Sequence, residues 1–127
     1  MKILSIVPAT LTLVFMLALA PVYAAAAKDK VRTVADINVN MAKLTGQTVS
    51  AKGKVVKVNN GIMKRNFLHI QDGTGDATTN NLVVTSKQTA KVGDQISITG
   101  VVALNRDFGS GYSYPILIED ASIKVKK

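Results

Sequence analysis

The sequence predicts an all-β domain, a five-stranded Greek-key barrel with one short N-terminal helix. Short segments in which apolar and polar residues alternate are separated by glycine, proline, asparagine and aspartate, which is typical of strands joined by turns. Two of these segments share the same apolar spacing around a central glycine, Gly53 in one and Gly100 in the other. Glycine lets a long strand bend sharply enough for a sheet to close into a barrel. The chain has no cysteine, so this barrel depends on packing and hydrogen bonds rather than on disulfides.

Residues 1–24 are predicted to be a cleavable secretory signal. Lys2 supplies an early positive charge, an apolar run follows from Leu11 to Leu19, and small residues precede the expected cut after Ala24. The apolar run is shorter than the roughly 20 residues that a membrane-spanning helix needs, and Pro21 breaks its end. We therefore expect export to the periplasm and no transmembrane anchor in the mature chain.

The mature chain is expected to divide into a charged leader with a short helix, residues 25–43, and a β domain, residues 44–127. Without the signal, 15 lysines and arginines stand against 8 acidic residues. Such a basic excess favours polyanions such as nucleic acid, acidic glycans or anionic lipid headgroups, although it also serves solubility alone. The absence of cysteine excludes thiolate metal sites and covalent haem attachment through cysteine.

The helix is predicted over about residues 34–43. Thr33 is a suitable N-cap, and Gly46 stops the pattern. Residues 25–32, before the cap, are expected to be flexible. The apolar residues recur at spacings of three and four, namely Val34, Ile37, Met41 and Leu44.

The first hairpin is predicted from a change of period. Apolar residues alternate from Val49, and the phase then shifts where Val55 and Val56 are adjacent, which indicates a β-bulge. Asn59-Asn60-Gly61 predicts the turn, and the second strand covers about residues 62–71. Leu68 and Ile70 share one face of that strand, and the other face carries Arg65, Phe67, His69 and Gln71.

Turn signals divide the rest of the chain into three further strands. Pro115 belongs at the start of the last strand because it has no N–H to donate to a ladder. In chain order we expect a turn at 72–76, a strand at 82–84, a small helical linker within 86–92, a strand at 96–104, a glycine-rich loop at 105–113 and a strand at 116–125.

Three stretches resemble the oligonucleotide/oligosaccharide-binding (OB) fold of the tRNA-anticodon type. Leu44–Val55 resembles its first strand, Asn66–Gly75 its second strand and turn, and Lys91–Val102 its fourth strand. The resemblance covers about residues 44–125 and implies a fold rather than a function, because this fold hosts many functions. In the exported setting the chain looks like small periplasmic bacterial OB-fold proteins of the nucleic-acid-binding kind.

That resemblance implies a ligand face across the first three strands, flanked by the loops after strands one and four. Cations that follow phosphates, beside rings that stack bases, suit single-stranded nucleic acid or an acidic oligosaccharide. The alternative interpretation is structural: the rings cover apolar surface, and the lysines are only solvated. Because Phe67 lies opposite Leu68, we expect it to face out of the core. The expected face holds Lys52, Lys54, Lys57, Arg65, Phe67, His69, Arg106, Phe108, Tyr112 and Tyr114.

Metal and haem sites find weaker support. His69 is the only histidine, and a soft copper contact from Met63 and His69 on one strand face is conceivable, although metal sites usually need several converging ligands. The chain is also similar to the periplasmic haem chaperone of cytochrome c maturation, but Gly73 stands where the His-x-x-x-Tyr motif needs tyrosine. Asp72-x-Thr74-x-Asp76 imitates a calcium loop whose later positions then fail.

Catalysis is not expected. The chain has no Gly-x-Ser-x-Gly elbow and no cysteine nucleophile, and no orienting partner for His69 is evident. We therefore expect a non-enzymatic periplasmic binding module without a cofactor. The alternatives are an accessory protein for metal or haem cofactor assembly, and a stress-related module that binds another periplasmic protein.

Overall fold

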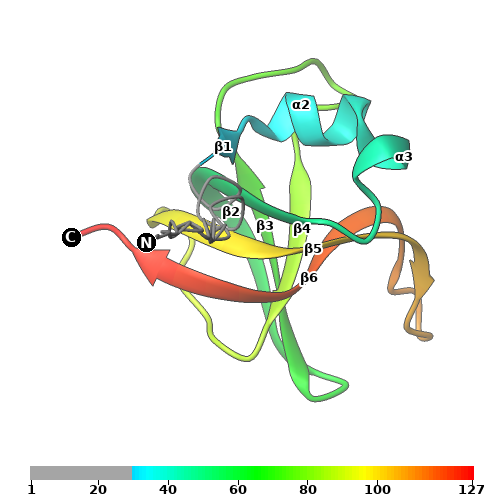
Figure 1. Cartoon of the computed structure of the whole chain (residues 1–127). Helices are drawn as coiled ribbons and strands as arrows, with labels where there is room; N and C mark the ends of the chain where they lie inside the picture. Colours follow the sequence, from blue (N-terminus) through cyan, green and yellow to red (C-terminus); the bar gives the residue numbers. More distant parts are fainter. Residues whose placement is uncertain (1–29) are drawn as a thin grey trace, which may run out of the picture.

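A computed structural model of the protein describes residues 30–127. Its sheet closes into a barrel in the order β2-β3-β4-β6-β5, with β5 pairing back onto β2 (Figure 1). Neighbouring strands are antiparallel except β4 and β6, which run parallel. This is the strand order of an OB fold, so the predicted fold class is confirmed. The barrel strands are β2 (Thr48–Ile62), β3 (Arg65–Gln71), β4 (Leu82–Ser86), β5 (Gln95–Asp107) and β6 (Ser113–Val125).

The predicted helix is present as two short pieces, α2 (Val34–Val39) and α3 (Met41–Leu44), which cover one end of the barrel (Figure 1). Thr33 caps α2 as expected, since its Oγ1 accepts a hydrogen bond from the Asp36 N–H at 3.0 Å. Within residues 30–127 no helix has both the length and the apolar character needed to cross a membrane.

The expectation that residues 25–32 are flexible is wrong at the end of this leader. Val31 and Arg32 form a short strand, β1, which pairs in parallel with Ser50 and Ala51 of β2. This pairing adds β1 beside β2 and fixes the approach to α2. The predicted signal peptide, residues 1–24, and the rest of the leader before residue 30 lie outside the described residues.

The predicted bulge in β2 is confirmed. Val55 pairs with Ile70, but the next pair joins Lys57 to His69, so Val56 is the extra residue and is 38% exposed. Val55 also bonds outside β3: its N–H donates to the Asp94 carbonyl and its carbonyl accepts from the Gly93 N–H, both at 2.8 Å. The bulge therefore bends β2 where it passes from β5 to β3.

The predicted turn at residues 59–61 is wrong. β2 continues to Ile62, and the chain reverses at Met63 and Lys64, whose φ values of 51° and 67° are left-handed. The Asn66 side chain holds the segment in the strand, because its Oδ1 accepts a hydrogen bond from the Gly61 N–H at 2.9 Å. Met63 therefore lies in the turn and does not share a strand face with His69, which removes the geometric basis of the copper hypothesis.

The expected helical linker within residues 86–92 is also wrong: Ser86 ends β4, and residues 87–92 form a bend, an irregular segment and the start of a turn. The Gln88 side chain forms the hydrogen bonds to β6 that a paired strand backbone would form. Its Oε1 accepts from the Ile123 N–H at 2.8 Å, and its Nε2 donates to the Ile123 carbonyl at 3.3 Å. The glycine-rich loop is shorter than expected, since β5 runs to Asp107 and β6 starts at Ser113.

The join between β4 and β6 depends mainly on side chains. One backbone pair, Val84 with Ile118, links these strands. Beyond it, the Ser86 hydroxyl donates to the Ala121 carbonyl at 2.6 Å, and Thr85 Oγ1 accepts from the Asp120 N–H at 3.3 Å. Thr85 and Ser86 are buried polar residues that satisfy their hydrogen bonds in this way.

Two glycines lie where another strand passes too close for a side chain. A Cβ at Gly100 would lie 2.6 Å from Ile118 Cγ2 and 2.8 Å from the Glu119 carbonyl oxygen. At Gly53 it would lie 2.9 Å from the Gln71 carbonyl oxygen. These approaches give a steric reason for glycine at both positions that the strand pattern singles out.

Candidate functional site

Four aromatic residues gather on the outer side of the sheet, where the β5–β6 hairpin lies over β3. We call Phe67, Phe108, Tyr112 and Tyr114 the aromatic cluster. The Phe67 ring is 5.2 Å from the rings of Phe108 and Tyr112 and 5.8 Å from that of Tyr114, measured between centroids. The side chains of Val83 on β4 and Leu117 on β6 pack with this cluster. These rings form a second small core outside the barrel.

The expectation that Phe67 faces solvent is therefore wrong. Phe67 points away from the barrel interior, opposite Leu68, as the alternation requires. The hairpin covers that outer face, however, and leaves Phe67 0% exposed. A ring with both faces packed against protein offers no platform on which a base could stack.

The two arginines of the predicted face hold this hairpin in place. The guanidinium carbons of Arg65 and Arg106 lie 4.9 and 5.2 Å from the centre of the Phe108 ring, which is cation–π geometry. Arg106 also forms an ion pair with Glu119 across the β5–β6 hairpin. Both arginines therefore have contacts within the protein.

His69 lies between the aromatic cluster and the lysines of β2. Its ring is 6.2 Å from that of Tyr114, and its Nδ1 lies 3.3 Å from the Asn81 amide nitrogen. Its Nε2 is buried without a hydrogen-bond partner. Burial, together with the positive charge of Lys57 on the paired strand, lowers the pKa of His69 below its usual 6.5. Within residues 30–127 no three histidine, cysteine or acidic side chains converge as a metal site would require.

Because the pKa of His69 is lower in the folded state, the unfolded state takes up this proton first on acidification. We expect the free energy of unfolding to decrease as the pH falls through 6.5 toward the lower folded value. Urea unfolding between about pH 8 and pH 5 measures this slope, and His69→Gln should flatten it. An equally steep slope in His69→Gln would assign the effect to other groups.

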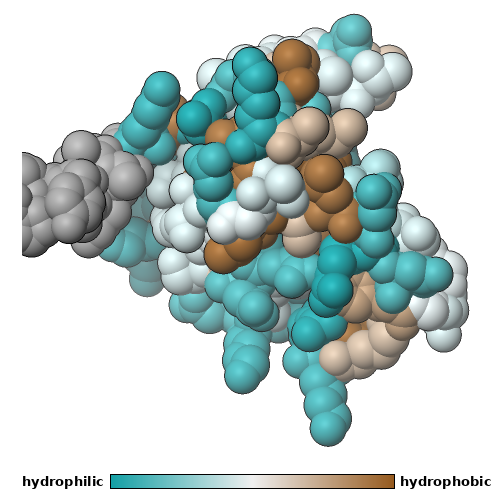
Figure 2. Space-filling model, turned by 45° about the vertical axis from the view of Figure 1, so that its right-hand side comes forward, coloured by the Kyte–Doolittle hydropathy of each residue, from teal (hydrophilic) through white to brown (hydrophobic). Residues whose placement is uncertain are grey.

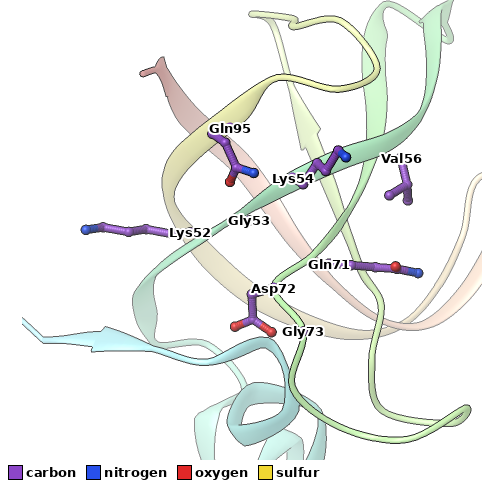
Figure 3. Close-up of a pocket in the computed structure, with 8 residues that line it drawn as sticks. All are labelled: Lys52, Gly53, Lys54, Val56, Gln71, Asp72, Gly73 and Gln95. Carbon is purple, nitrogen blue, oxygen red and sulfur yellow. The ribbon is translucent and has the colours of Figure 1, made fainter. Parts of the chain in front are cut away.

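Lys52 and Lys54 precede the bulge in β2 and lie on the outer face of that strand. They line a hollow of about 370 Å³. Figure 3 shows the Gln95 side chain between them, with Lys52 extending to one side and Lys54 to the other. Gln71 from β3 lines the same hollow. The hollow therefore combines two cations with neutral amides that can donate hydrogen bonds.

Asp72 also lines this hollow, but its carboxylate bonds to the N-terminal end of α2. It accepts hydrogen bonds from the Val34 N–H at 2.9 Å and from the backbone and hydroxyl of Thr74. Burial acts to raise its pKa, but these hydrogen bonds outweigh that and lower it. Figure 3 shows the Asp72 carboxylate turned toward α2, away from both lysines. The Asp72-x-Thr74 pattern, which resembles the start of a calcium loop, therefore caps the N-terminal end of α2.

A second hollow of about 390 Å³ continues the first and shares Lys52 and Gln95 with it. Lys124 and Lys126, at the end of β6, line it with Ser97. The predicted face omits both lysines because it follows the first three strands. Their signal in the sequence is the alternation of Ile123 and Val125 with lysines, which turns the lysines outward. On the face drawn in Figure 2, hydrophobic residues reach the surface in small groups among hydrophilic ones.

The structure thus divides the predicted face into two areas. Phe67 and Gln71 are four residues apart on β3, about 13 Å along the strand. At the Phe67 end lie the aromatic cluster and both arginines, and at the Gln71 end lie Lys52 and Lys54. Lys57 and His69, paired across β2 and β3, lie between the two areas.

The comparisons with known proteins assign the chain to no family. No protein-family model and no curated protein matches the chain. Among solved structures it is similar to the Pot1pC domain of Schizosaccharomyces pombe bound to the single-stranded DNA CGGTTACGGT. The identity is 13%, the match covers 78% of this chain and 88% of that one, and the TM-score is 0.48. We draw nothing about a ligand from a likeness of this size.

Proposed function

We propose that this protein is a non-enzymatic, exported OB-fold module that binds a polyanion, first of all single-stranded nucleic acid, through the lysines of β2. The observation that carries the proposal is that Lys52 and Lys54 are both exposed, line the same hollow and have no carboxylate partner within residues 30–127. The excess of basic residues supports a polyanion, and the signal-like N-terminus supports a periplasmic location.

Such a site binds by neutralising charge. Each lysine that meets a phosphate releases counterions from the nucleic acid, so the affinity depends steeply on salt. An acidic oligosaccharide offers carboxylates or sulfates to the same lysines and is the other polymer to compare. The salt dependence reports how many lysines take part, whichever polymer is bound.

The experiment measures fluorescence anisotropy of a labelled single-stranded oligonucleotide, and in parallel of an acidic oligosaccharide, with mature protein at several salt concentrations. Wild-type protein should bind the oligonucleotide more weakly as salt rises. The double variant Lys52→Gln/Lys54→Gln should bind more weakly at low salt. Its slope of log K against log salt should be shallower by about 0.7 for each phosphate that is no longer neutralised.

The matched control is Lys43→Gln/Lys64→Gln. It removes the same charge from exposed positions on α3 and in the β2–β3 turn, outside both hollows. It should keep the wild-type affinity within about twofold. The proposal is overturned if wild-type protein ignores both polymers at low salt, or if the control variant loses as much affinity as the β2 variant.

A further inference from the structure

Four lysines are placed in two rows across three neighbouring strands. In one row Lys52 of β2 pairs with Ser97 of β5, and Ser97 pairs with Lys124 of β6. In the next row Lys54 pairs with Gln95, and the Gln95 carbonyl accepts a hydrogen bond from the Lys126 N–H at 2.9 Å. We call Lys52, Lys54, Lys124 and Lys126 the lysine grid.

The strand register fixes the dimensions of this grid. Lysines two residues apart on one strand are about 7 Å apart, because a strand rises about 3.3 Å per residue. Lysines on β2 and β6 are separated by the width of two strand spacings, about 10 Å. The backbone positions are therefore set by the barrel, and only the flexible ends of the side chains adjust to a ligand.

The middle of the grid is neutral and small. Ser97 and Gln95 lie on β5 between the lysine-bearing strands. The following row toward the helices continues with hydroxyls, where Ser50 Oγ lies 2.9 Å from Thr99 Oγ1. The residues lining the second hollow include no aromatic ring and no carboxylate: Lys52, Gln95, Ile96, Ser97, Lys124, Val125 and Lys126.

We infer that the lysine grid binds the phosphodiester backbone of a single strand and does so by charge, without stacking the bases. This rests on the proposed function and adds the β5–β6 side of the barrel to its site. The strand runs across β5 from the lysines of β2 to those of β6, with Ser97 and Gln95 donating hydrogen bonds to phosphate oxygens. The rings that base stacking needs lie in the aromatic cluster, outside the second hollow: Phe67 is 0% exposed, and Phe108, Tyr112 and Tyr114 are partly buried against it.

The decisive comparison uses two labelled strands of equal length, about 12 nucleotides, one of oligodeoxythymidine and one abasic with the same phosphates. The abasic strand should bind within about twofold of the other, because even one stacked base changes the affinity roughly fivefold or more. The variant Lys124→Gln/Lys126→Gln should weaken both strands equally and flatten their salt dependence as far as Lys52→Gln/Lys54→Gln does. The Lys43→Gln/Lys64→Gln variant serves as the control.

Failure of this inference differs from failure of the proposed function. If wild-type protein binds neither strand nor the acidic oligosaccharide, the proposed function falls. If it binds the oligosaccharide alone, the polyanion site stands and this inference is wrong. If it binds oligodeoxythymidine but the abasic strand binds far more weakly, bases contribute and the charge-only mode is wrong. If Lys124→Gln/Lys126→Gln behaves like the control, β6 takes no part. Tighter binding to phosphatidylglycerol vesicles than to either strand, at equal phosphate concentration, would replace the nucleic acid with a membrane surface.

Discussion

Replacing Phe67 with alanine is expected to lower the free energy of unfolding by about 3–5 kcal/mol. The ring is 0% exposed and contacts the other three members of the aromatic cluster, so its removal leaves a cavity between β3 and the β5–β6 hairpin. In a domain of this size such a loss lowers the midpoint of thermal unfolding by more than about 10 °C.

Urea unfolding of wild-type protein, Phe67→Ala and Phe67→Leu measures this effect. Leucine keeps most of the apolar volume, so it should cost much less than alanine. Lys64→Gln, at an exposed position in the turn between β2 and β3, is the control for a neutral surface change. A loss below about 1 kcal/mol in Phe67→Ala would mean that the β5–β6 hairpin does not seal β3 in solution.

Replacing Gly100 with valine is expected to lower the free energy of unfolding by about 2–3 kcal/mol. The new Cβ would lie 2.6 Å from Ile118 Cγ2 and 2.8 Å from the Glu119 carbonyl oxygen. The carbonyl belongs to a strand backbone that is paired on the barrel, so the neighbours cannot give way without moving β6. Gly53→Val should cost less, because the nearest atom there, the Gln71 carbonyl oxygen, is 2.9 Å away.

Thermal unfolding of Gly100→Ala, Gly100→Val and Val101→Thr gives the comparison. Alanine already carries the clashing Cβ, so it should destabilise the barrel as well. Val101→Thr changes the exposed neighbour on the same strand and should have little effect, since threonine suits a strand. Stability unchanged in both Gly100 variants would contradict the close approach of β5 and β6.

The alternation of apolar residues was enough to predict the barrel, because burial of one strand face has a local signature of period two. It predicted the β2 bulge at Val55 and Val56 for the same reason. The sequence places the turn after β2 too early, because Asn59-Asn60-Gly61 carries a strong local turn signal. A contact from Asn66 keeps Gly61 in the strand, and the chain turns at Met63 instead.

The status of Phe67 shows the limit of the same signal. Alternation tells that Phe67 and Leu68 lie on opposite faces of β3, and the structure agrees. It does not tell whether a distant hairpin covers the outer face. The lysine grid is not predictable from alternation for the same reason. Lys52 and Lys124 both lie beside Ser97, and this follows only from the register of three strands.

The β4–β6 join has a consequence for how the barrel opens. Its closure is held largely by the side chains of Thr85, Ser86 and Gln88 rather than by a continuous backbone ladder. Separating β4 from β6 breaks these side-chain hydrogen bonds, the single Val84–Ile118 pair and the packing of their buried side chains, and leaves the β2–β3 and β5–β6 hairpins intact. Sub-global opening of native proteins follows such low-cost boundaries. Opening at this edge therefore turns the closed barrel into an open sheet, in which the pairing of β2 with β5 still joins the two hairpins.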